Sequence, residues 1–98
     1  MGVTIHSVLV RDQELPATTV EGHAVVLSLD AGSYFDLNRV ATEIWGMLSK
    51  PRRVGEIFES LSEQHDVDTE TLIRDVTPFL QTLIDYKLIR MIDAGKKR

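Results

Sequence analysis

The three histidines of the chain are the first candidates for metal binding or catalysis. His6, His23 and His65 are spread along the sequence, and His65 stands three residues before Asp68, in the spacing of a metal-ligand pair. A structural zinc site needs four ligands. The chain contains no cysteine, and no further ligands converge on this pair in sequence. We therefore predict no metal site and interpret the histidines as solvated or helix-capping.

A row of glutamates is the second candidate for chemistry. Glu56, Glu59 and Glu63 are spaced to share one face of a helix, and paired carboxylates can do acid–base work inside a cleft that shifts their pKa values. These three stand opposite an apolar stripe, which is typical of a solvated face. The chain also lacks a nucleophile elbow, a phosphate loop and a dinucleotide fingerprint. We predict no catalytic residues, no cofactor and no enzymatic activity.

The length and composition limit the classes of protein to which the chain can belong. The chain has 98 residues, 11 Lys and Arg, 15 Asp and Glu, and a formal net charge of −4. This length predicts one domain over residues 1–98. No apolar run approaches the ~18 residues of a membrane span and no signal peptide is recognisable, so a cytoplasmic location without membrane contact is expected. The acidic balance opposes nucleic acid as a partner, since phosphate binding needs clustered Lys and Arg.

The elements that would position these residues are strands first and helices afterwards. Strands are predicted at residues 17–20, 23–29 and 33–37, separated by Glu21-Gly22 and by a turn ending at Gly32. They form an antiparallel meander in which Val25, Leu27 and Leu29 share one face. Residues 3–10, within an N-terminal segment 1–15, are either a further strand or an arm over the sheet. Residues 94–98 are expected to be a frayed tail.

Three helices complete an α+β fold that we predict to be winged-helix-like. The first begins at the N-cap Asn38 and ends at Lys50-Pro51, the second covers Val54 to His65, and the third begins at the N-cap Asp68. The apolar arc of the third spans about 160°, against the ~100° that one-sided packing needs. This helix therefore packs against two neighbours or leaves apolar surface for a ligand. Pro78 is expected to kink it.

The third predicted strand, residues 33–37, is the feature from which a binding function can be inferred. In a meander, residues 33–37 lie at the sheet margin, where only Asp36 protects unpaired backbone groups. Such an edge can accept an extended peptide as a further strand. The alternative, that residues 3–10 already cover this edge, stays open at this point.

The sequence resembles the PqqD-like family over about residues 16–90. The residues that carry the resemblance are Val25-Val26-Leu27-x-Leu29-x-x-Gly32-x-Tyr34-Phe35-x-Leu37-Asn38-x-Val40-Ala41-x-x-Ile44-Trp45, Arg53-Val54-x-Glu56-Ile57, Asp66-Val67-Asp68, Asp75-Val76-x-x-Phe79-Leu80-x-x-Leu83 and Leu88-Ile89. The Tyr-Phe-x-Leu-Asn segment with the later Ile-Trp is most similar to stand-alone members from lasso-peptide biosynthesis. Two departures are Arg53, where the family usually has Thr, and Pro78; the first predicts a late or frayed start of the second helix.

The resemblance implies a RiPP recognition element, a non-catalytic module that binds the leader of a ribosomally made precursor peptide. The implied binding residues are Ser33, Tyr34, Phe35, Asp36 and Leu37 on the strand, and Leu72, Asp75, Val76, Phe79 and Leu83 on the third helix. The implied partners are the leader, a separate transglutaminase-like leader peptidase and a cyclase. Alternatives are a chaperone for a radical-SAM peptide-modifying enzyme, a winged-helix DNA-binding regulator, a small enzyme, and a structural subunit that pairs with its own copy.

Overall fold

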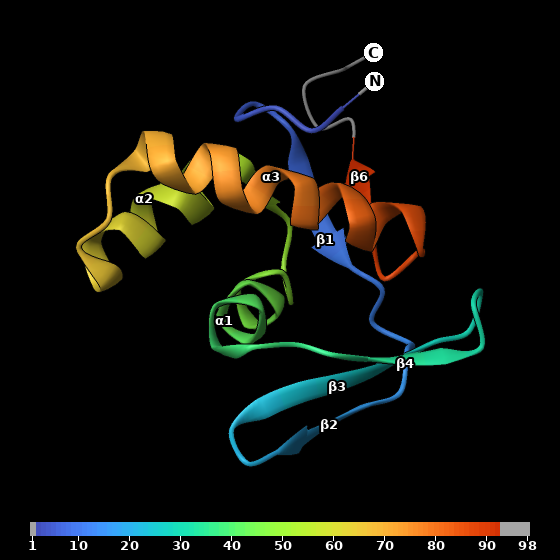
Figure 1. Cartoon of the computed structure of the whole chain (residues 1–98). Helices are drawn as coiled ribbons and strands as arrows, with labels where there is room; N and C mark the ends of the chain where they lie inside the picture. The colour runs from blue at the N-terminus through green and yellow to red at the C-terminus, as the bar shows by residue number, and fades with distance from the viewer. Residues whose placement is uncertain (1, 93–98) are drawn as a thin grey trace.

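A computed structural model describes residues 2–92 of the chain, which form three helices and two three-stranded antiparallel sheets (Figure 1). The elements are, in chain order, β1 (Val8–Arg11), β2 (Ala17–Val20), β3 (His23–Ser28), β4 (Ser33–Asp36), α1 (Arg39–Met47), β5 (Arg52–Arg53), α2 (Val54–His65), α3 (Thr69–Asp85) and β6 (Ile89–Ile92). The predicted frayed tail lies outside the described residues. Among those residues, no helix is both long and apolar enough to cross a membrane.

The predicted meander is confirmed as the sheet β2-β3-β4, with β4 at its margin. Glu21 and Gly22 both have positive φ (53° and 86°), as a two-residue hairpin turn requires. The buried face of β3 carries Ala24, Val26 and Ser28, however, so the apolar face predicted at Val25, Leu27 and Leu29 points away from the core. Both faces of this strand are largely apolar, and a period of two cannot tell which of them the helices will cover.

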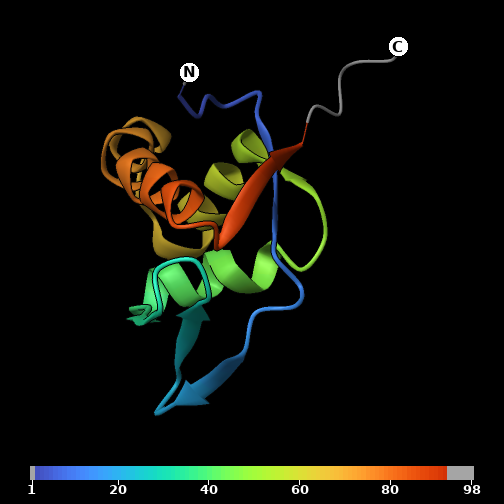
Figure 2. The same ribbon diagram turned by 90° about the vertical axis from the view of Figure 1, so that its right-hand side faces the viewer.

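The second sheet, β5-β1-β6, was not predicted. Its central strand is β1, which pairs with β5 through Leu9 and Arg52 and with β6 through Leu9 and Met91. Residues 8–11 are therefore a further strand, and the alternative that residues 3–10 cover the edge of β4 is wrong. Residues 52–53, which directly precede the second helix, form the short strand β5. In Figures 1 and 2, α1 lies between the meander and the layer formed by this sheet, α2 and α3.

The helices α1 and α3 begin directly after the N-caps predicted from the sequence, whereas α2 begins at Val54 without a side-chain cap. Asn38 accepts a hydrogen bond from the Ala41 N–H at 2.8 Å and begins α1. The start of α2 is not frayed, although Arg53 makes no side-chain cap. Its first two N–H groups, at Val54 and Gly55, donate to the carbonyls of Ser7 and Ile5 at 2.8 and 2.9 Å. The N-terminal segment thus supplies the acceptors that a capping side chain would otherwise provide.

The third helix is the longest and is continuous through Pro78. Asp68 caps its start by accepting from the Thr71 N–H at 3.0 Å. At its other end Lys87 has a φ of 67°, and Leu88 N–H donates to the Leu83 carbonyl at 2.9 Å. This is the hydrogen bond of a Schellman cap. It turns the chain into β6 and buries Leu88 in the core.

Candidate functional site

The free edge of β4 exposes a defined set of backbone groups. Leu37 N–H donates to the Ala24 carbonyl at 2.8 Å, and Phe35 lies opposite Val26 in the same register. In an antiparallel ladder alternate residues bond to the neighbouring strand. The backbone N–H and C=O groups of Tyr34 and Asp36 therefore point away from β3. No other strand of residues 2–92 pairs with this side of β4.

The C-terminal end of α3 lies beside the inner face of β4. The rings of Phe35 and Tyr86 are 5.0 Å apart, inclined at 52°. Tyr86 is the C-cap of α3, and steps of four and three residues lead from it back along one flank to Thr82, Phe79 and Asp75. We name these four residues the β4-side flank. The opposite flank, with Gln81, runs toward the N-terminal segment, since a β-carbon on Gly2 would lie 3.9 Å from Gln81 Oε1.

The helix residues predicted from the resemblance divide into two groups. Leu72, Val76 and Leu83 are buried in the hydrophobic core. Phe79 is half-buried against this core, and Asp75 is exposed. The apolar arc therefore packs mainly against neighbouring elements, while Phe79 keeps part of its ring at the surface. Thr82 and Tyr86 belong to the same flank and were not among the predicted site residues. Their spacing of three and seven residues from Phe79 would have placed them on the same side of the helix.

A shallow hollow lies on the outer face of the meander, next to the free edge. It has a volume of about 190 Å³ and is lined by Val20, Glu21, His23, Val25 and Asp36. Tyr34 points to the same face, with Leu27 as its cross-strand neighbour, and its side chain is 72% exposed. Sequence reasoning missed this hollow because its lining comes from three strands, whose alignment depends on the pairing register.

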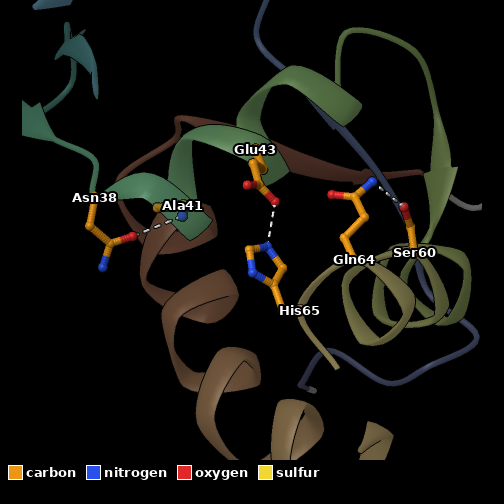
Figure 3. A network of polar contacts seen from close by, with 6 residues as sticks. All are labelled: Asn38, Ala41, Glu43, Ser60, Gln64 and His65. Atoms are coloured by element: carbon orange, nitrogen blue, oxygen red, sulfur yellow. Dashed lines mark hydrogen bonds and ion pairs between the residues drawn. The ribbon is translucent and has the colours of Figure 1, made fainter. Parts of the chain in front are cut away.

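The other candidates for chemistry have structural roles or lie on the surface. His65 Nε2 is 2.9 Å from Glu43 Oε1, so this histidine links α2 to α1 rather than pairing with Asp68 (Figure 3). Within residues 2–92, no three or more His, Asp or Glu side chains are grouped to hold a metal ion. Hydrogen bonds from the Thr71 side chain and backbone, with the charge of Arg74, lower the pKa of Asp68.

The glutamates of α2 are exposed, as predicted. Glu56, Glu59 and Glu63 all lie at the surface, and the backbone N–H of Arg53 donates to Glu56 Oε1 at 3.4 Å. A helix that presents carboxylates on its outer face repels phosphate. The arrangement therefore does not favour a DNA-reading role for α2.

Two comparisons bear on the site. The family model described as coenzyme PQQ synthesis protein D (PqqD) matches residues 23–89, a range that includes β4 and α3. The solved structure of TbiB1 in complex with the TbiA(β) leader peptide is similar to this chain, with a TM-score of 0.72 and 29% sequence identity; the match covers 82% of this chain and 93% of that one. No curated protein sequence matches the chain.

Proposed function

The chain belongs to the PqqD family, and from that premise we propose that it is a RiPP recognition element, a non-catalytic module that captures the leader of a ribosomally made precursor peptide. The leader adds as a further strand along residues 33–37, which comprise β4 and Leu37, and rests against the β4-side flank of α3. The similar structure of TbiB1 contains a leader peptide, which supports this class of ligand. The resemblance to stand-alone members favours a lasso-peptide precursor.

The observation that carries the proposal is the outward direction of the backbone groups of Tyr34 and Asp36. Two N–H donors and two C=O acceptors in one row suit an extended chain. Natural sheets usually protect such an edge with Lys, Pro or a bulge, and β4 has only Asp36. Backbone pairing would set the direction and register of the leader, and side chains beside the strand would set its specificity.

The apolar contacts would come from Phe35, Phe79 and Tyr86. Phe35 and Phe79 are half-buried and Tyr86 is 42% exposed, so each keeps surface that a peptide side chain can cover. The resemblance to the lasso branch implies a leader with an aromatic residue and a proline, and such side chains would suit this surface. Among the core residues of the same helix, Leu72, Val76 and Leu83 would support this surface from beneath, and Asp75 would lie at its end.

Capture would serve a separate enzyme. A bound leader raises the effective concentration of the precursor at any enzyme that docks on the same module. We propose a cytoplasmic leader peptidase of the transglutaminase-like class as that enzyme, followed by a cyclase. A radical-SAM peptide-modifying enzyme is the alternative partner within the same class of function.

Amide hydrogen exchange measured by NMR tests the proposal. In the free protein the amides of Tyr34 and Asp36 should exchange fast and that of Phe35 slowly, because only Phe35 is bonded to β3. The probes are synthetic leader regions from short reading frames beside the gene, with the TbiA(β) leader as a heterologous probe. Binding should slow exchange at Tyr34 and Asp36. Binding that leaves both amides fast, or no binding of any probe, would contradict strand addition.

A further inference from the structure

The hollow beside Asp36 is lined by charged and apolar side chains that have no role in the proposed strand addition. Its lining combines two carboxylates, Glu21 and Asp36, with the side chains of Val20 and Val25. Among residues 2–92, no Lys or Arg lines the hollow, and His23 is the one lining residue that can carry positive charge. A long cationic side chain suits such a place, because its methylene stem covers apolar surface while its charged head meets a carboxylate.

The register of an added strand would place one of its side chains next to this hollow. The meander is purely antiparallel, and a leader that continues the pattern would place one residue directly opposite Asp36. The side chains of such cross-strand neighbours project from the same face of the sheet. Asp36 and Val25 are themselves cross-strand neighbours, so this face is the one that carries the hollow.

The next residue on the same face would meet Tyr34. In an antiparallel pair the residue opposite Tyr34 stands two positions after the one opposite Asp36, because the two chains run in opposite directions. Tyr34 and its neighbour Leu27 present apolar surface there. The residue between these two would point to the inner face, toward Phe35 and the β4-side flank of α3.

We infer that the hollow is a subsite for a Lys or Arg side chain of the bound leader, which would then carry the pattern cation-x-apolar with its first and third residues on the outer face. This inference rests on the proposed function and specifies the leaders that the module selects. Opposite charges directly across a strand pair contribute modestly, so a cation should be preferred over alanine by about two- to fivefold.

An unbiased peptide selection tests the subsite. The full chain is immobilised and an mRNA-displayed library of random 15-residue peptides is selected against it, in parallel with Asp36→Lys and Asp30→Lys. Asp30 is an exposed acid of the β3–β4 turn outside the hollow, so its substitution controls for the change in overall charge. We expect cation-x-apolar peptides on the wild type and on Asp30→Lys, and an acidic first position on Asp36→Lys.

One enriched peptide then gives the quantitative check. Replacing its cation by alanine should weaken binding about two- to fivefold on the wild type and by a smaller factor on Asp36→Asn, in which Glu21 is the remaining carboxylate of the hollow. A double-mutant cycle resolves this difference. Enriched peptides without the cation, or the same pattern on Asp36→Lys as on the wild type, would overturn the subsite and leave strand addition standing. Enrichment of no peptide by the wild type would overturn both proposals.

Discussion

The hydroxyl of Ser28 donates a hydrogen bond of 3.0 Å to the backbone carbonyl of Tyr86, 58 residues further along the chain. Ser28 ends β3 and is fully buried, and Tyr86 caps the end of α3. Ser28 Oγ also accepts from the Ala31 N–H at 3.1 Å. This one side chain therefore joins the meander to the C-terminal end of α3, close to the two surfaces that we propose to hold the leader.

Ser28→Ala should destabilise the protein by about 1–3 kcal/mol, because the Tyr86 carbonyl and the Ala31 N–H lose a buried partner. The free energy of unfolding, from urea denaturation, measures the effect. Ser33→Ala is the control, since Ser33 is exposed on β4 and surface substitutions usually stay within about 0.5 kcal/mol. Equal stability of the two variants would show that the hydrogen bond does not couple the meander to α3.

Asp36→Pro should weaken leader binding at least about tenfold, because proline removes an outward-facing donor. The ladder with β3 does not use this N–H, so the fold should persist. Asp36→Ala is the matched control: it keeps the N–H and loses only the carboxylate, and we expect a loss of no more than about fivefold. Calorimetric titration with one leader peptide compares them. Equal affinities of the two variants would mean that the backbone of Asp36 does not pair with the leader.

Phe79→Ala should weaken leader binding by about 1–3 kcal/mol, the range for truncation of an apolar anchor. Ile73→Ala is the control. Ile73 is 37% exposed on α3 and lies about 120° around the helix from Phe79 at 100° per residue. Folding is checked by circular dichroism before each titration. Unchanged affinity of folded Phe79→Ala, or an equal loss for Ile73→Ala, would remove Phe79 from the site.

The parts of the fold that the sequence predicted are those decided by local chemistry. Asn38 and Asp68 cap helices at the positions where their side chains can accept from the backbone three residues on. The positive φ of Gly22 and Gly32 follows from the turns that they occupy. The margin position of β4 followed in turn from three consecutive strands joined by two short turns. The winged-helix likeness stays a prediction.

The parts that were missed depend on contacts between distant segments. The strand β5 has only two residues, Arg52 and Arg53, and exists because β1 lies beside it. The strand β6 pairs with residues about 80 positions earlier in the chain. Neither has a periodic signal of its own. For the same reason the resemblance could indicate the helix on which we propose the site but could not separate its exposed residue Asp75 from the buried Leu83.

Gly55 shows how a residue that is poor for a helix can be required by its neighbours. A β-carbon at this position would lie 3.3 Å from the Ile5 carbonyl oxygen, which accepts the Gly55 N–H. Gly46, in α1, has open space around it. We expect Gly46→Ala to raise the free energy of unfolding by about 0.5–1 kcal/mol through helix propensity, and Gly55→Ala to gain nothing or to lose stability. An equal gain for both in thermal unfolding would show that the N-terminal segment does not constrain α2.

The cap of α3 should make stability depend on pH in acid. Hydrogen bonds from the Thr71 side chain and backbone, and the charge of Arg74, hold the pKa of Asp68 below its usual value of 3.8. A carboxyl group whose pKa is lower in the folded than in the unfolded state contributes stability above the unfolded value, and this contribution is lost as the pH falls through the folded value.

Asp68→Asn isolates this contribution, because asparagine caps helices about as well as aspartate but does not titrate. We expect the wild type to be more stable than Asp68→Asn near pH 6, and the difference to shrink as the pH falls below about 4. Urea denaturation at a series of pH values measures it, with Glu63→Gln as a control that removes an exposed carboxylate from α2. A difference between the wild type and Asp68→Asn that stays constant down to about pH 2 would show that the Asp68 charge does not stabilise the start of α3.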